Sequence, residues 1–236
     1  MDKSFRYDNI SHQFLIARHQ IGDFGLHLSL VRSFSWGDNF PVESPFFPGT
    51  PLAYHYYFDL LVGLLEKVGV RIDVAFNGLS ILFFSLLLYV IYRLPQIIFK
   101  KSKLLGMLSV ILFVFHSNLT FIDFLKEKGL SLYAISDLWR LPDYINKGPF
   151  DGSLISIFFT MNVYLNQRHL IAALAISLIA FLILIPMVTK HHKSPYRIII
   201  FLGLILGLVS RVHTLVFFSA AISILIFLIV FRRFRF

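Results

Sequence analysis

Four long apolar segments constrain the fold of this chain more than any other feature. They span residues 74–92, 104–122, 170–188 and 212–231, and a shorter fifth segment spans 198–209. An apolar helix of about 20 residues is ~30 Å long, which matches the hydrocarbon core of a bilayer. Charged residues make up 15% of the chain, well below the roughly 25% of a soluble domain. The sequence therefore predicts an all-α polytopic membrane protein with about five transmembrane helices.

Lysine and arginine residues are unevenly distributed among the loops. The connectors after the first and third segments and the C-terminal tail hold ten basic residues and no acidic residue. These residues are Arg93, Lys100, Lys101, Lys103, Lys190, Lys193, Arg197, Arg232, Arg233 and Arg235. Because cytoplasmic loops are enriched in Lys and Arg, we expect a multi-pass protein of the cell membrane with these connectors in the cytoplasm. Residues 1–72 and 123–169 then form extracytoplasmic loops, and 73–236 form the transmembrane domain.

Composition also excludes several classes of function. The net charge of +9 comes largely from the basic connectors, so it gives little support to nucleic-acid binding and suits contact with anionic membrane lipid. The chain has no cysteine, which excludes disulfides, thiolate catalysis and cysteine-ligated metals. With five crossings and basic connectors inside, Met1 lies outside. We therefore expect the natural protein to carry an apolar segment of about 20 residues before it.

The stretch from Gly22 to Asp59 is polar and precedes the first apolar segment. Apolar residues recur at three- and four-residue steps over 23–36, and a second helical stretch covers 54–70. Prolines between 41 and 51 prevent a regular helix between them. This pattern predicts two amphipathic helices on the outer membrane surface. Because membrane segments hold charge only at high cost, we expect the functional groups in this loop.

Three residues of this loop are candidate catalytic groups. Asp23 and His27 are four residues apart, so they project from one helix face and can transfer a proton or bind a divalent cation. Asp23 is equally suited to cap the helix N-terminus. Asp38, in a Gly-Asp-Asn sequence, has the composition of a turn, and Asp59 follows an interfacial tyrosine run. A divalent cation is compatible with these residues but is not required by them.

Six further polar residues are candidates for substrate binding. They are Tyr54, His55, Arg168, His169, Arg211 and His213. A planar guanidinium suits a phosphate, although Arg168, just before a membrane entry, also suits a snorkelling residue. Arg211 lies between two apolar segments, where an arginine is costly unless it faces a polar cavity or a partner. We therefore expect Arg211 and His213 at the bottom of a polar cavity. Tyr54 and His55 suit an interfacial aromatic belt or a ligand site.

Short motifs along the chain resemble a known family. They are Asp23-Phe24 with His27, Asp38-Asn39-Phe40-Pro41, Pro51-Leu52, Tyr54-His55-Tyr56, Asn166-Gln167-Arg168-His169 and the stretch from Gly203 to His213. With an acid in the first outer loop, two surface helices and alternating short and long connectors, the chain resembles the GT-C superfamily of integral-membrane glycosyltransferases. Protein O-mannosyltransferases and lipid A aminoarabinose transferases belong to that superfamily. The closer likeness, from about Gly22 onward, is to uncharacterised multi-spanning bacterial proteins.

This resemblance implies transfer of a sugar from a polyprenyl-phosphate-linked donor to an unidentified acceptor on the extracytoplasmic face. It implies that Asp23 is the base that deprotonates the acceptor and that Arg168 or Arg211 holds the donor phosphate. Since GT-C families have additional membrane helices, it also implies that the chain is part of a longer protein. The alternative is a non-catalytic transport or scaffold subunit. A transporter predicts internal repeats and polar groups near the membrane midplane, which the sequence does not show.

Single cysteines introduced into this cysteine-free chain test the predicted topology. Cysteines at Ser102, Ser194 and Arg235 are expected to resist an impermeant thiol reagent in intact cells, because they lie in basic regions. Cysteines at Ser44 and Ser153 are expected to react. Labelling of positions 44 and 102 from the same side contradicts the topology.

Overall fold

The computed structural model describes most of the chain outside the second long loop. The described residues are 4–17, 21–99, 102–115, 126, 129, 131–134, 136, 145–146, 155–156, 163–164, 167–189 and 196–231. In the first helix, side chains are described from Phe24 onward. The predicted outer loop 123–169 and the basic connector at 190–195 therefore lie largely outside the described residues.

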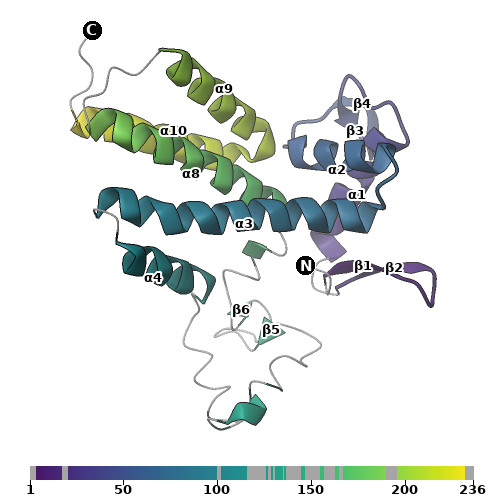
Figure 1. Ribbon diagram of the computed structural model, residues 1–236. Coiled ribbons are helices and arrows are strands. Elements are labelled where there is room, and N and C mark those ends of the chain that lie inside the picture. Colours follow the sequence, from purple (N-terminus) through teal and green to yellow (C-terminus); the bar gives the residue numbers. More distant parts are fainter. Residues whose placement is uncertain are drawn as a thin grey trace.

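Most of the described residues are helical (Figure 1). The helices are α1 (Ile21–Ser35), α2 (Tyr57–Lys67), α3 (Ile72–Ile98), α4 (Lys103–Val114), α8 (Arg168–Thr189), α9 (Tyr196–Val212) and α10 (Thr214–Val230). In Figure 1, α3, α8 and α10 run in one direction. The helix α9, which comes between α8 and α10 in the sequence, runs in the opposite direction. The N-terminal ends of α3, α8 and α10 consequently lie toward α1 and α2.

Three two-stranded antiparallel sheets supplement the helices, so the prediction of an all-α fold is wrong in this detail. They pair β1 (Phe5–Asp8) with β2 (Gln13–Ile16), β3 (Glu43–Ser44) with β4 (Phe47–Pro51), and β5 (Ile145–Asn146) with β6 (Ile155–Ser156). In the first hairpin the Asp8 carboxylate accepts hydrogen bonds from the backbone N–H and hydroxyl of Ser11, at 3.1 and 2.6 Å. Such short side-chain-to-backbone bonds favour a turn over a helix.

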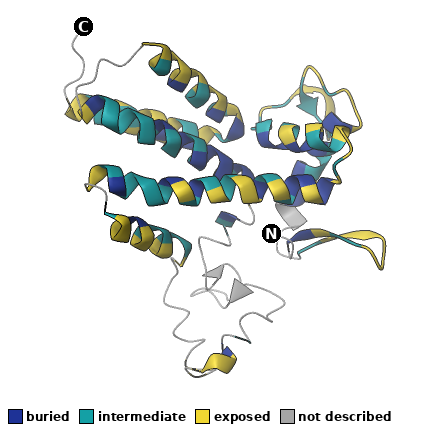
Figure 2. Cartoon of the chain, viewed as in Figure 1, coloured by how far each residue is buried: buried dark blue, intermediate teal, exposed yellow. Residues whose placement is uncertain are grey.

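Two of the described helices, α3 and α8, are long and apolar enough to cross a membrane. The helices α4 and α10 are apolar but shorter over their described residues. Exposed positions recur along α3, α4, α9 and α10 (Figure 2). The apolar residues among them include Leu82, Leu112, Leu204 and Leu215. An apolar surface of this extent is expected of helices that face lipid. The prediction of five transmembrane helices goes beyond this result.

Several helix bounds differ from the predicted ones. The helix α8 begins at Arg168, two residues before the predicted apolar segment, because the arginine is buried against protein groups. The helix α9 covers Tyr196–Val212 and is a longer helix than the predicted short segment 198–209. It is separated from α10 by His213 alone, whose ring caps α10 by accepting a hydrogen bond from the Val216 N–H at 3.4 Å. Hydropathy misses helix ends where polar residues have partners.

The two helices of the first loop pack against each other and against the long helices. Phe24 of α1 and Phe58 of α2 each contact the ring of Phe76 in α3, with centroid distances of 5.4 and 5.5 Å. These three rings are at most 2% exposed. The sequence predicted that the apolar faces of both helices lie on the membrane surface. Instead, protein covers much of both faces, since each helix supplies a side of the same core.

Gly63 of α2 allows the close approach of α1, and its substitution is expected to weaken this packing. A Cβ atom at Gly63 would lie 2.8 Å from Cβ of Phe34 and 2.9 Å from the carbonyl oxygen of Val31. Gly63→Ala is therefore expected to destabilise the protein by about 1–3 kcal/mol, as overpacking does. Thermal unfolding in detergent measures this change. Gly25→Ala in α1 is the control, because a Cβ there meets nothing within 4 Å; equal stability of both variants contradicts the packing.

Candidate functional site

Four histidines from four parts of the chain lie together at the ends of the long helices. They are His27 of α1, His55 before α2, His169 in the first turn of α8, and His213 between α9 and α10. Their ring centroids lie 4.9 Å apart for His27 and His169, 4.3 Å for His55 and His169, and 5.1 Å for His55 and His213. The centroids of His169 and His213 are 5.3 Å apart. We call this group the histidine cluster.

Backbone contacts hold the segments of the cluster together. The Tyr56 N–H donates a hydrogen bond to the Arg211 carbonyl at 3.0 Å, which ties the segment before α2 to the end of α9. The ring of Tyr54 stacks on that of His55 with a centroid distance of 3.8 Å. Tyr54 also faces His27, at a centroid distance of 6.1 Å. The predicted aromatic run thus packs against the histidine cluster.

His27 is paired with the carboxylate of Asp59, for which the sequence predicted a structural role. Its Nδ1 lies 2.9 Å from Oδ2 of Asp59 in α2, and both side chains are buried. Burial raises the pKa of Asp59, and the hydrogen bond from His27 opposes that shift. When Asp59 is ionised it can only accept a hydrogen bond, so Nδ1 of His27 carries the proton and Nε2 has the lone pair. This is the arrangement of a carboxylate-oriented general base.

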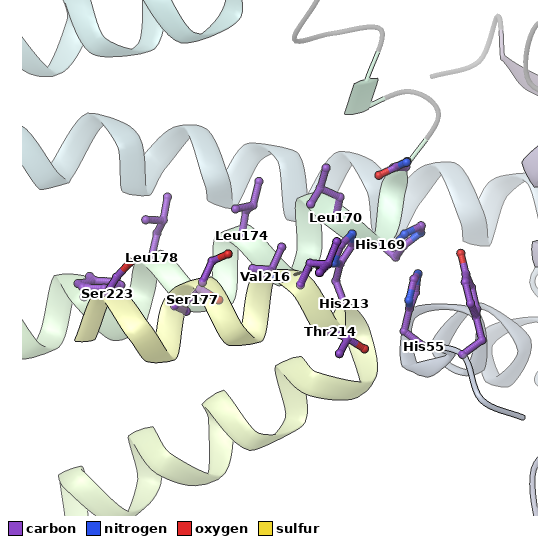
Figure 3. A pocket seen from close by; sticks show the side chains of 16 residues that line it. His55, His169, Leu170, Leu174, Ser177, Leu178, His213, Thr214, Val216 and Ser223 are labelled. Atoms are coloured by element: carbon purple, nitrogen blue, oxygen red, sulfur yellow. Dashed lines mark hydrogen bonds between the residues drawn. The ribbon is translucent and has the colours of Figure 1, made fainter. Parts of the chain in front are cut away.

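A cavity of about 630 Å³ extends between α8 and α10 from three members of the histidine cluster, while His27 packs against His169 and is not among the lining residues. Its polar end is formed by His55, His169 and His213 (Figure 3). Leu170, Leu174, Leu178 and Phe181 of α8 and Val216 and Ala220 of α10 line much of the remainder, together with Ser177, Ser219 and Ser223. Its volume is within the usual range for ligand sites. A polar end joined to an apolar channel fits an amphiphilic molecule.

Two buried polar atoms at this cavity have no hydrogen-bond partner among the described residues. They are Nε2 of His55 and Oγ of Ser177. Ser177 is 3% exposed and lines the apolar part of the cavity (Figure 3). Because an unpaired buried polar atom costs roughly 1–3 kcal/mol, such atoms indicate a missing partner. Both point to a ligand with polar groups at the histidine end and along the cavity.

Burial and neighbouring imidazoles keep His55 uncharged. Desolvation, and then the proximity of His213 and His27, lower the pKa of His55 to about 4. The ring is therefore neutral near pH 7. A neutral imidazole donates from one nitrogen and accepts at the other, which suits either a proton acceptor or a hydrogen-bond donor to an anion.

The other acids of the first loop have different surroundings. The side chain of Asp23, at the start of α1, lies outside the described residues. The expected pairing of Asp23 with His27 is thus untested, and the described partner of His27 is Asp59. Asp38 is exposed and forms an ion pair with Lys67, with an Nζ–Oδ1 distance of 3.2 Å. Its roles as turn residue and as catalytic candidate both stay predictions, although its side chain faces solvent.

The two candidate phosphate-binding arginines do not line the cavity. Arg168 is 1% exposed, and its guanidinium donates hydrogen bonds to Asn77 at 2.5 Å and to the hydroxyl of Ser4. Arg211 has an exposed side chain at the end of α9. Of the expected pair at the bottom of the cavity, His213 lines it and Arg211 contributes only its carbonyl nearby.

The sequence around Asp59 contains a signal that this acid is buried. It occupies the same face of α2 as Phe58, Val62 and Gly63, all of which are buried. An acid on the apolar face of an amphipathic helix needs a partner, because an unpaired buried charge is costly. The identity of that partner could not be read from the spacing, since His27 is in a different helix.

No group of three or more histidine or acidic side chains in the described part of the chain has the arrangement of a metal site. The ring planes of His213 are inclined by only 19° to His55 and 23° to His169. The ring planes of His55 and His169 are inclined by 41°. The sequence is compatible with a bound divalent cation, and the described residues do not add support for one.

Residues 17–133 match the model of a family described as uncharacterized membrane protein (DUF2298). The chain is a membrane protein. The matched segment includes His27, His55 and Asp59 and ends before His169 and His213. No curated protein and no solved structure matches the chain. The comparisons thus support the membrane character of the protein and leave its chemistry to the site itself.

Acidification is expected to destabilise the protein through His55. The folded pKa of about 4 lies below the ordinary 6.5, so the unfolded chain binds more protons between these values and stability falls as the pH drops through them. His55→Gln removes this contribution, so its unfolding midpoint is expected to fall by a few °C less between about pH 7 and about pH 4.5. The raised pKa of Asp59 has the opposite effect on the pH dependence of stability. Asp59 is present in both the unmodified protein and His55→Gln, so its effect cancels in the comparison. Equal decreases contradict the assignment.

Proposed function

We propose that this membrane protein is a GT-C-like glycosyltransferase that moves a sugar from a polyprenyl-phosphate-linked donor to an acceptor on the extracytoplasmic face. The observation that carries the proposal is the position of the buried His27–Asp59 pair beside the polar end of an apolar cavity. A lipid-linked sugar has the same two parts. Its reacting end is polar, and its tail requires an apolar channel.

In the proposed reaction, His27 acts as the general base and Asp59 positions it. Nε2 of His27 accepts the proton of the acceptor O–H group as that oxygen forms a bond to C1 of the sugar. The bond from C1 to the phosphate oxygen breaks, and its electron pair leaves with the polyprenyl phosphate. The hydrogen bond between Nδ1 and Asp59 fixes the ring and stabilises the imidazolium that results. Protons and charge balance without another reactant.

The cavity supports the lipid part of the proposal. Leucine side chains of three successive turns of α8, Leu170, Leu174 and Leu178, follow one another along its length (Figure 3). Apolar walls contribute about 25 cal/mol for each Å² of apolar ligand surface that they remove from contact with water. The histidine end alone contacts the part of the donor that reacts. This division favours a lipid-linked donor over a free nucleotide sugar.

The proposed orientation places the reaction outside the cytoplasm. The histidine cluster lies at the ends of α8, α9 and α10 that face α1 and α2 (Figure 1). The basic connectors follow the opposite ends of α3, α8 and α10 in the sequence. Cytoplasmic basic connectors therefore require an extracytoplasmic site. Polyprenyl-phosphate sugars are the donors suited to that side, since they carry the activated sugar on a lipid.

The base assignment is tested by glycosyl transfer from a polyprenyl-phosphate sugar in membranes that contain the protein. Asp59→Asn is expected to lower kcat by ~10²–10⁴-fold, because it removes the charge that orients and stabilises His27. The KM is expected to change little, since Asp59 contacts His27 and not the cavity. Asp38→Asn, at an exposed acid, is the matched control and is expected to retain activity.

Asp23→Asn distinguishes the two acids. Loss of transfer in Asp23→Asn with normal turnover in Asp59→Asn returns the role of base to Asp23, as the family resemblance implies. If transfer survives both substitutions, or if no transfer is found with the natural full-length protein, the enzyme assignment is wrong and the transport or scaffold alternative replaces it.

A further inference from the structure

We propose that His55, His169 and His213 form a phosphate subsite, which holds the phosphate group of an isoprenoid lipid through imidazole N–H groups and takes up a proton when it binds. This inference deepens the proposed function, on which it rests for the choice of an isoprenoid tail. It replaces the expectation that an arginine holds the phosphate. The three rings are called the phosphate subsite below.

The three rings of the subsite come from three different parts of the chain. The three ring centroids lie 4.3–5.3 Å from one another. Nδ1 of His213 accepts the hydrogen bond from the Val216 N–H, so Nε2 of this ring carries the proton and donates. Nε2 of His55 is buried and has no partner in the described part of the chain. The subsite thus has at least one N–H donor ready and one orphan nitrogen.

The arrangement of the three rings suits a phosphate better than a metal ion. A metal requires nitrogen atoms that converge on one point, and no group of three or more histidine or acidic side chains in the described part of the chain has that arrangement. A phosphate group offers three oxygens that accept hydrogen bonds at different positions. Donors from neighbouring rings can each meet a different oxygen.

The helices that carry two of these rings favour an anion at the same place. The 22-residue helix α8 begins at Arg168, and the 17-residue helix α10 begins directly after His213. A helix N-terminus has a partial positive charge and unpaired N–H groups, which stabilise a phosphate. The hydroxyl of Ser177 lies farther along the same cavity and has no hydrogen-bond partner among the described residues. Ser177 is only 3% exposed.

Few other charged groups surround the subsite. The pair of His27 and Asp59 faces it from α1 and α2, and Tyr54 faces it from the segment before α2. Arg168 precedes His169 but bonds to Asn77 and Ser4, and Arg211 of α9 has an exposed side chain. Neither arginine lines the cavity at the subsite. The imidazoles are therefore the groups that respond to an incoming anion.

Proton uptake follows from the charge of the ligand. Before binding, the pKa of His55 is about 4, so this ring is neutral at pH 7. A phosphate dianion in contact favours the imidazolium form and raises the pKa. The complex then holds more protons than the separate molecules, and affinity increases as the pH falls. The second pKa of a phosphate monoester is about 6, so this increase is confined to pH values above it.

Calorimetric titration of the full chain in detergent micelles with farnesyl phosphate tests the subsite. Titration in two buffers of different ionisation enthalpy is expected to show net proton uptake near pH 7. The dissociation constant is expected to decrease by up to about tenfold per pH unit between about pH 8 and about pH 6.5. Farnesol, which lacks the phosphate, is expected to bind more weakly and without proton uptake. Inorganic phosphate, which lacks the tail, is expected to bind more weakly than farnesyl phosphate.

Variants separate the subsite from the cavity. His169→Gln is expected to weaken farnesyl phosphate binding at least about tenfold and to leave farnesol binding unchanged. His55→Gln is expected to weaken farnesyl phosphate binding in the same way, with less proton uptake. This variant is used for the test if His169→Gln does not fold. His12→Asn is the control. His12 is exposed in the first hairpin, and its φ of 55° is one that asparagine tolerates.

Four results overturn the proposal. The first is equal affinity for farnesyl phosphate and farnesol, and the second is pH-independent binding that neither cluster variant weakens. The third is binding that requires Zn²⁺ and is abolished by a chelator, which assigns the rings to a metal. Tighter binding of inorganic phosphate than of farnesyl phosphate assigns the site to a free anion and also overturns it. Since none of these titrations measures transfer, they are independent of the Asp59→Asn assay that tests the proposed function.

Discussion

The burial of the Arg168 guanidinium is the interaction on which the arrangement of this protein depends. It hydrogen bonds to Asn77 and Ser80 of α3 and to Ser4 beside the first hairpin. Its Cζ atom also lies 4.8 Å from the ring centroid of Phe76. A buried cation is tolerated only with such partners, because its desolvation costs several kcal/mol. One side chain therefore joins α3, α8 and the N-terminal hairpin.

The position of Arg168 also determines the position of the next residue. His169 follows it in the first turn of α8 and is 4% exposed. With Arg168 fixed against α3, His169 projects toward α1 and the segment before α2, where His27 and His55 lie. A structural cation and a site residue thus occupy adjacent positions. This explains why a motif with a residue at the cavity also contains an arginine that does not line it.

Much of the architecture could be predicted from sequence, because hydropathy reflects a local property. The segments 74–92 and 170–188 lie within α3 and α8. The hairpin of β1 and β2 was missed, since its strands are only four residues long and β2, Gln-Phe-Leu-Ile, lacks an alternation of apolar and polar residues. The start of α8 was misplaced because hydropathy cannot recognise a charge that has buried partners.

The site was only partly predictable. His27, His55, His169 and His213 were all candidates, but nothing in their spacing shows that they meet. Their contacts depend on the packing of α1, α8 and the turn between α9 and α10. Asp59 was given a structural role because its neighbours in the sequence are tyrosines, whereas its neighbours in space are His27 and the protein core. Long-range packing decides which polar residues form a site.

The single residue between α9 and α10 has a consequence for biosynthesis. The His55 segment bonds to the Arg211 carbonyl, and α10 forms one wall of the cavity. A ribosome that has completed α8 has therefore produced only His27, Asp59, His55 and His169, with no wall opposite α8. The binding cavity forms only after the last hairpin has been inserted and folded back. The cavity is thereby restricted to chains whose C-terminal helices have already been assembled.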